Sequence, residues 1–170
     1  KLPLLIEIKD IKGDLHVHTK RSDGSHDYDE LINAARELGY EYIAITDHSK
    51  GLGIARGLNE EKIIEEKKEI DALNKRLKGF RILSGIEVDI RSDGHLDFSD
   101  DILKQLDIVI ASIHSGFKQS REQLTQRIIS AMKNPYVSFI AHPTGRLIGE
   151  RDPYNIDIEE IIKTAFKTNT

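Results

Sequence analysis

A chain of 170 residues is long enough for one domain with a substantial core. The lack of cysteine excludes disulfides and thiolate metal sites, so any metal must be held by nitrogen and oxygen ligands. A formal net charge of -4 argues against a surface that coats nucleic acid, although bound cations can reverse the sign locally. Because the chain has no apolar run of about 18 residues and no visible signal peptide, we expect a soluble cytoplasmic protein that does not bind membranes.

Short apolar runs alternate with amphipathic stretches along the chain. The expected strands are LHVHT (15–19), YIAITDH (42–48), FRILSGIEVDI (80–90), DIVIASIH (107–114) and VSFIAHP (137–143). Helical spacing of apolar residues falls between them, most clearly over residues 59–77. Strands that alternate with helices predict an α/β protein with a parallel sheet and helices outside it. We expect residues 1–12 to be an entry segment or linker remnant and residues 13–170 to form the domain.

Histidines gather at the ends of the expected strands. In LHVHT, His16 and His18 alternate with apolar residues, so both imidazoles face one side of the strand. Three further strands end in His48, His114 and His142, and the remaining strand carries Glu87 near its end. One such histidine is more often a hydrogen-bonded core residue than a ligand. Because the carboxyl ends of parallel strands meet at one rim, the joint pattern predicts a metal site there.

The tripeptide SDG occurs twice, at 22–24 and at 92–94, and Asp-Gly is common in turns. Asp23 directly follows the strand that carries two histidines, so its carboxylate is a candidate ligand. Asp93 and His95 fall in a hairpin-like turn and receive no functional role. Spacing alone leaves both readings of Asp23, as a turn residue or as a ligand, open.

The motifs DLHVHT, ITDHS, GIEVDI, ASIHS and AHPTGR resemble the polymerase and histidinol phosphatase (PHP) domain. The likeness covers nearly the whole chain and is strongest to the C-terminal PHP domain of bacterial and archaeal family X DNA polymerases. It implies a distorted seven-stranded β/α barrel with up to three divalent metal ions at its C-terminal rim. The family's final motif, an Asp-x-His that follows a later strand, does not occur after the last expected strand of this sequence. We therefore expect a truncated barrel of about five βα units.

The resemblance also implies a set of metal ligands, which are His16, His18, Asp23, His48, Glu87, His114 and His142. The first two histidines would bind one ion, and the glutamate would bridge it to a second ion completed by the last two histidines. The aspartate and the remaining histidine would hold a third. Without the final motif, only the second ion keeps all its protein ligands. The expected cofactors are two to three Mn²⁺ or Zn²⁺ ions, and the sequence does not choose between the two metals.

Phosphoester hydrolysis suits such a cluster, because paired cations clamp a phosphate and activate water at neutral pH. The sequence shows no Ser-His-Asp pattern and no cysteine nucleophile, so we expect direct attack by activated water rather than a covalent intermediate. Arg146 and Arg151, which follow HPTGR, and Lys50, which follows His48, are candidate contacts to substrate phosphate. Each arginine could equally be a solvated surface side chain, and for Lys50 the solvated surface interpretation is favoured.

The resemblance implies a 3′-to-5′ exonuclease or end-processing enzyme that accompanies a family X DNA polymerase in repair. Its expected partners are single-stranded or gapped DNA 3′ ends and, in cis, an N-terminal polymerase region. Two alternatives remain: a histidinol-phosphatase-like phosphomonoesterase, and a non-catalytic module that metal ions stabilise.

Overall fold

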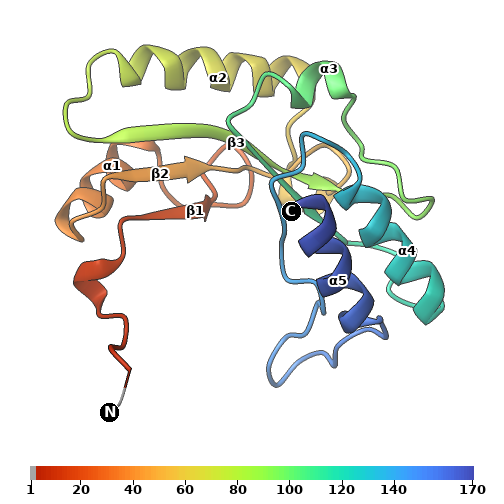
Figure 1. Cartoon of the computed structure of the whole chain (residues 1–170). Helices are drawn as coiled ribbons and strands as arrows, with labels where there is room; N and C mark the ends of the chain where they lie inside the picture. The colour runs from red at the N-terminus through yellow and green to blue at the C-terminus, as the bar shows by residue number, and fades with distance from the viewer. Residues whose placement is uncertain (1–2) are drawn as a thin grey trace.

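The computed structural model describes residues 3–170 as one parallel sheet flanked by helices (Figure 1). The strands are β1 (Gly13–Val17), β2 (Tyr42–Ile45), β3 (Arg81–Asp89), β4 (Ile108–Ser112) and β5 (Phe139–Ile140). Each strand pairs in parallel with the next one along the chain, which is the strand order of β/α barrels. The strands curl into half of such a barrel. The expected α/β class, with five strands present, is confirmed.

Before, between and after these strands, residues 3–170 form five α-helices and two 3₁₀ turns. The α-helices are α1 (Tyr28–Glu37), α2 (Glu60–Asn74), α3 (Asp100–Leu103), α4 (Arg121–Met132) and α5 (Ile158–Thr168), and the turns are η1 (Ile8–Asp10) and η2 (Gly53–Ala55). Side-chain caps set the helix starts: Asp27 and Ser120 each close a capping box at the starts of α1 and α4. The sequence patterns did not predict the short helix α3.

The core has two parts that fix the strands in place. One cluster packs β4 and the carboxyl-terminal half of β3 against α4, with Ile86, Val88 and Ile128 fully buried. The other packs β2 against α1 and α2, with Ile45 and Ile70 at its centre. Each fully buried side chain of this kind contributes about 1.5–3 kcal/mol through apolar burial. The carboxyl ends of β2, β3 and β4 are therefore held on rigid supports.

Two elements differ from the sequence pattern. Strand β5 has only two residues, although backbone bonds from Ser138 N to Val109 O and from Ala141 N to Ala111 O continue its pairing with β4. Leu15, which the alternation places opposite the two histidines of its strand, is 37% exposed because β1 is an edge strand with β2 as its neighbour.

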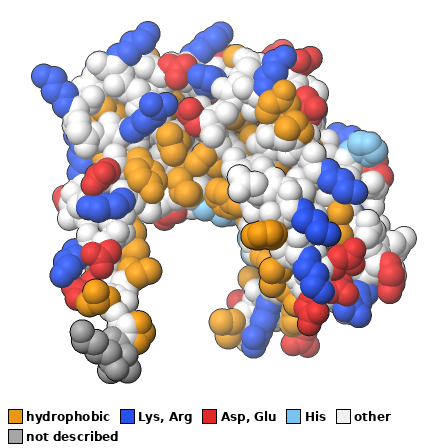
Figure 2. All heavy atoms as spheres, in the orientation of Figure 1, with side chains coloured by type: hydrophobic (Ala, Val, Ile, Leu, Met, Phe, Trp, Pro, Cys, Tyr) orange, Lys and Arg blue, Asp and Glu red, His pale blue; other side chains and the backbone are white. Residues whose placement is uncertain are grey.

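The expected entry segment lies on the surface. Residues 3–12 are all exposed and contain the turn η1, whereas Lys1 and Leu2 lie outside the described residues. Figure 2 shows exposed apolar side chains along this segment and along α5, the two parts that project downward in that view. Among residues 3–170, no helix has both the length and the apolar character needed to cross a membrane.

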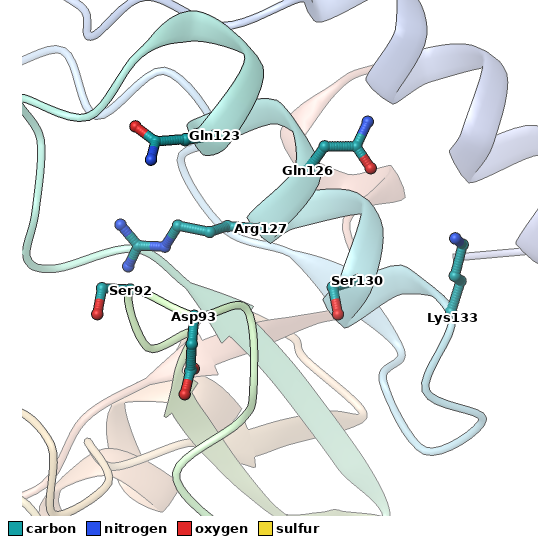
Figure 3. A pocket seen from close by; sticks show the side chains of 7 residues that line it. All are labelled: Ser92, Asp93, Gln123, Gln126, Arg127, Ser130 and Lys133. Carbon is teal, nitrogen blue, oxygen red and sulfur yellow. The ribbon is translucent and has the colours of Figure 1, made fainter.

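A buried arginine on α4 ties the ends of β3 and β4 together. Arg127 is 2% exposed and donates hydrogen bonds to the backbone carbonyls of Ile90, just after β3, and Ser115, just after β4. Figure 3 shows its side chain reaching from α4 toward Ser92. Both residues line an open hollow of about 390 Å³. The hollow has no histidine in its lining, so it is separate from the strand-end cluster.

Candidate metal centre

Backbone pairing brings His48 beside Glu87. Beyond β2, the chain continues alongside β3, with Glu87 N bonded to Asp47 O at 3.0 Å and Ser49 N bonded to Glu87 O at 3.0 Å. His16 lies within β1, His18 follows it, and two further histidines come two residues after the ends of β4 and β5. The parallel order of the strands thus places all these residues along one rim.

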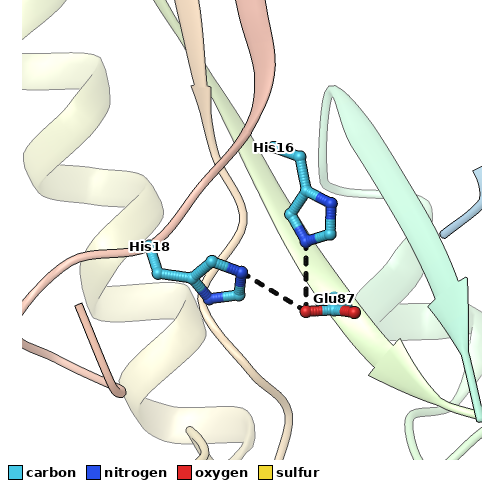
Figure 4. A group of neighbouring side chains, drawn as sticks. All are labelled: His16, His18 and Glu87. Atoms are coloured by element: carbon cyan, nitrogen blue, oxygen red, sulfur yellow. Dashed lines mark ion pairs between the residues drawn. The ribbon is translucent and has the colours of Figure 1, made fainter. Parts of the chain in front are cut away.

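The carboxylate of Glu87, 1% exposed, lies at the centre of the rim. Five imidazole nitrogens surround it: His16 Nε2 at 3.1 Å, His18 Nε2 at 3.3 Å and His48 Nδ1 at 3.2 Å from Oε2, with His114 Nε2 at 3.2 Å and His142 Nε2 at 2.9 Å from Oε1. Figure 4 shows His16 and His18 converging on this carboxylate. Ser112 Oγ also donates to Oε1 at 2.6 Å.

Asp23 lies between two of the same histidines. Its Oδ1 is 3.4 Å from His18 Nδ1, and its Oδ2 is 3.4 Å from His48 Nε2. The turn that carries Asp23 is closed by bonds from Ser22 N and Gly24 N to Thr19 O. The structure thus brings together all seven residues for which the resemblance implies a ligand role, which itself stays a prediction.

The pKa values of Glu87 and the surrounding histidines depend on one another. Burial acts to raise the pKa of Glu87, but hydrogen bonds with His114 and other histidines hold it far below its usual range. Burial acts to lower the pKa of His114, yet hydrogen bonds with Asp89 and Glu87 raise it to about 9. Burial lowers the pKa of His48. The pKa values of His48 and His114 thus shift in opposite directions, although both rings contact the carboxylate of Glu87.

The donor set fits divalent cations. His16 Nε2, His18 Nδ1 and His48 Nδ1 are buried, and none has an aligned hydrogen-bond partner within residues 3–170, although carboxylate oxygens lie at ion-pair distance. Buried imidazole nitrogens without aligned hydrogen-bond partners are available as ligands for a cation. Among residues 3–170, three groups have ligand atoms within 4.8 Å of one another: His16, His18 and Glu87; His18, Asp23 and His48; and His48, Glu87 and His114.

His142 is placed differently from the other four. It approaches Glu87 closely, but it is absent from the three groups, and its side chain is 45% exposed. Its φ of 28° lies in the left-handed region, which is uncommon for a residue other than glycine. Strained residues of this kind cluster at functional sites.

Sequence reasoning missed the carboxylates that support the histidines. Asp89 Oδ1 is 3.1 Å from His114 Nδ1, and Asp47 accepts hydrogen bonds from the Thr19 and Ser22 side chains. A signal was available for Asp89, because Glu87 and Asp89 are two apart on one strand and share a face, as His16 and His18 do. No comparable pattern marked Asp47.

The three predicted phosphate contacts divide into two groups. Arg146 and Arg151 line a cavity together with His114 and His142. Lys50 instead pairs its ammonium with Glu60 and lies 5.6 Å from the centre of the Phe98 ring. The structure thus brings the arginines, but not the lysine, to the edge of the cluster.

A parallel β/α half-barrel with this rim defines a protein equipped to bind divalent cations. The family model of the PHP domain matches residues 14–168, so the chain belongs to the PHP domain family. It is 52% identical over 166 residues to the DNA polymerase/3′-5′ exonuclease PolX of Bacillus subtilis, covering 98% of this chain and 29% of that protein.

Phosphatases are also similar to the chain. It is 38% identical over 162 residues to a probable phosphatase of Thermoanaerobacter sp. (strain X514), covering 89% of this chain and 59% of that protein. The chain thus spans less than two thirds of the length of these relatives. The fold matches a histidinol phosphate phosphatase from Lactococcus lactis, solved with zinc, L-histidinol and phosphate, with a TM-score of 0.52 and 18% identity over 92% of this chain and 70% of that one.

Proposed function

We propose that this chain is the metal-dependent phosphoesterase domain of a DNA-processing protein, and that it removes nucleotides from DNA 3′ ends. The observation that carries this proposal is the buried carboxylate of Glu87, which five imidazoles surround. Three buried nitrogens of these imidazoles have no aligned partner among residues 3–170. The similarity to PolX, whose name records a 3′-5′ exonuclease, supports DNA as the substrate. A polymerase region in cis is the corresponding partner.

The ligands proposed for two to three Mn²⁺ or Zn²⁺ ions are the seven side chains of the rim: His16, His18, Asp23, His48, Glu87, His114 and His142. When bound, such ions supply Lewis acidity toward the phosphate and the attacking water. Hydrolysis forms a P–O bond to the water oxygen, breaks the ester P–O bond and leaves one water proton on the released alcohol.

The chain's own residues then orient the substrate. Glu87 stays ionised against burial, because its histidine hydrogen bonds lower its pKa, and so it keeps negative charge at the centre. Arg146 and Arg151 lie beside His114 and His142, where guanidinium groups can donate to phosphate oxygens. Asp89 fixes which ring nitrogen of His114 faces the centre.

The test uses the full-length protein, stripped with a chelator and reloaded with Mn²⁺ or Zn²⁺, on a 5′-labelled single-stranded primer. We expect stepwise shortening that His16→Ala and Glu87→Gln reduce at least 100-fold. His95→Ala is the matched control, because His95 is exposed and lies outside the cluster. Shortening at the wild-type rate by both cluster variants would refute the proposal.

A second candidate is a phosphomonoesterase, which the similarity to probable phosphatases favours. The same preparation, assayed on a nucleoside monophosphate and on the primer, distinguishes the two by the ratio of kcat/KM values. A third candidate, a module that metal ions only stabilise, predicts that chelation lowers the melting temperature while neither substrate is turned over.

A further inference from the structure

A cavity of about 260 Å³ adjoins the metal centre at its β4–β5 end. Its walls are mainly apolar and include Leu52, Ile113, Phe117 and Leu147, with Arg146 and Arg151 as the charged members. His114 and His142 line the cavity and also contact Glu87 Oε1. A substrate whose phosphate lies at the metal centre would therefore extend its organic part directly into this space.

Phe117 and Arg151, which both line the cavity, belong to a stack of flat groups that Tyr154 extends behind the wall. The rings of Phe117 and Tyr154 are nearly parallel, with an interplanar angle of 11° and centroids 5.6 Å apart. The guanidinium carbon of Arg151 lies 4.5 Å from the centroid of the Phe117 ring. Aromatic rings and guanidinium planes are the surfaces on which proteins stack nucleobases.

The segment that supplies Arg146, Leu147 and Arg151 is held in a closed loop. Tyr154 N bonds to Thr144 O at 3.1 Å, and Leu147 and Arg151 exchange two backbone hydrogen bonds of 2.9 Å. The side chain of Arg151 donates from Nε to Gly145 O at 2.9 Å. These bonds fix the wall before any ligand arrives, which lowers the entropic cost of binding.

Gly145 lets this loop pack against the stack. Its φ is 58°, and an added Cβ would lie 2.2 Å from the Tyr154 ring. Leu147 does not belong to the stack. It lines the cavity beside the metal centre, and it is 48% exposed. An apolar side chain in that position suits contact with a ligand.

The metal centre and the adjoining cavity differ in polarity, so they suit different parts of a substrate. A phosphate is more stable beside cations and guanidinium groups than among Leu52, Ile113 and Leu147, because burying a charge among apolar groups is costly. A planar, weakly polar group is instead stabilised by burial among these apolar side chains. The volume of about 260 Å³ is below the roughly 300–1,000 Å³ of pockets for drug-sized ligands, so it suits a single ring system.

We propose that this cavity holds the nucleobase of the residue whose phosphoester is hydrolysed. The proposal deepens the proposed function and rests on it. It assigns Leu147 and the Phe117–Arg151 stack to recognition of a planar heteroaromatic ring, with Arg151 acting as a stacking surface as well as a cation.

The test uses the full-length, Mn²⁺-loaded protein and two primers that differ only in a 3′-terminal thymidine or an abasic deoxyribose analogue. We expect at least about tenfold faster cleavage of the thymidine end, because stacking is lost at the abasic end. Leu147→Ala and Arg151→Lys, which keeps the charge but not the plane, should both reduce this preference. Ile148→Ala should preserve it, because the neighbouring Ile148 is exposed and does not line the cavity.

Equal cleavage of the two primers, or a preference that survives both cavity variants, would overturn this inference and leave the proposed hydrolysis intact. Calorimetric binding of thymidine 5′-monophosphate and of 2-deoxyribose 5-phosphate to the same loaded protein distinguishes failure of the cavity assignment from failure of the proposed hydrolysis. If no phosphoester is hydrolysed but the nucleotide binds more tightly than the sugar phosphate, and Leu147→Ala abolishes the difference, the cavity assignment stands and the proposed function fails. Equal binding of both compounds overturns the assignment.

Discussion

Asp89 Oδ1 lies 3.1 Å from Nδ1 of His114, and it also accepts from the backbone N of His114 at 3.3 Å. These two contacts fix both the ring and the chain that carries it. The opposite ring nitrogen, Nε2, then lies 3.2 Å from Glu87 Oε1. A carboxylate that holds one nitrogen of a histidine while the other faces a cation site is a recurrent arrangement in metalloproteins.

The first prediction concerns this support. Asp89→Asn keeps the shape of the side chain but removes its charge, so the His114 ring becomes a weaker ligand. We expect metal affinity to fall about 10-fold, the low end of the 10–100-fold range for such partners. Competition with a chromophoric chelator measures the change. Asp93→Asn, in the exposed turn 92–94, is the control, and an equal affinity in both variants would contradict the assigned role.

The histidine rim follows from simple sequence rules. Period-two alternation places His16 and His18 on one face, and parallel strands bring their carboxyl ends to one rim. Glu87 belongs to the same rim by the same argument. These predictions need only local geometry and the strand order, which the alternation of strands and helices implies.

Side chains that pair across the fold could not be predicted in this way. Lys50 pairs with Glu60 on α2, and Arg151 lies over Phe117, 34 positions earlier in the chain. The partner in each case depends on how a loop folds back, which no periodicity encodes. The hydrogen bonds of Asp47 to the Thr19 turn have the same origin.

The second prediction concerns a buried acid behind the rim. Glu66 on α2 is fully buried, and burial together with the neighbouring Asp47 raises its pKa to about 9. Tyr28 Oη lies 3.2 Å from its Oε2. Glu66 is therefore protonated in the folded protein at neutral pH, whereas it is ionised in the unfolded chain above its ordinary pKa of 4.5.

The raised pKa makes stability depend on pH. The folded state binds the extra proton, so the contribution of Glu66 is full below about pH 4.5 and is lost as the pH rises toward about 9, by at most about 1.4 kcal/mol per unit. Glu66→Gln cannot ionise, and its unfolding free energy should fall less steeply between pH 6 and pH 8.5. Denaturant melts of both proteins measure the slopes. Glu69→Gln, at a half-exposed position, should keep the wild-type slope, and identical slopes for all three proteins would exclude a protonated Glu66.

The third prediction tests the turn that carries Asp23. An added Cβ at Gly24 would lie 2.3 Å from His18 O, so Gly24→Ala must displace the turn, the His18 backbone or both. We expect a loss of about 1–3 kcal/mol of stability, as for other overpacked sites, and fewer bound ions per chain. Elemental analysis after dialysis counts the ions. Gly53→Ala meets nothing within 4 Å and should leave both quantities unchanged; a wild-type ion count in Gly24→Ala would show that this turn does not hold a ligand.

The last prediction concerns removal of the metals. Under the proposed function, ions bind the folded rim and not the unfolded chain, because the seven proposed ligands come from separate strands and from the Asp23 turn, which only folding brings together. At a free concentration of 100 times Kd, one ion adds about 2.7 kcal/mol to the unfolding free energy. For a domain of this size, that corresponds to a melting temperature roughly 5–10 °C higher with metal than after chelation. Glu87→Gln should show a much smaller difference, because the central carboxylate charge is gone. A wild-type melting curve that chelator does not shift would mean that the imidazoles around Glu87 are satisfied by hydrogen bonds alone, and the metal centre would have to be abandoned.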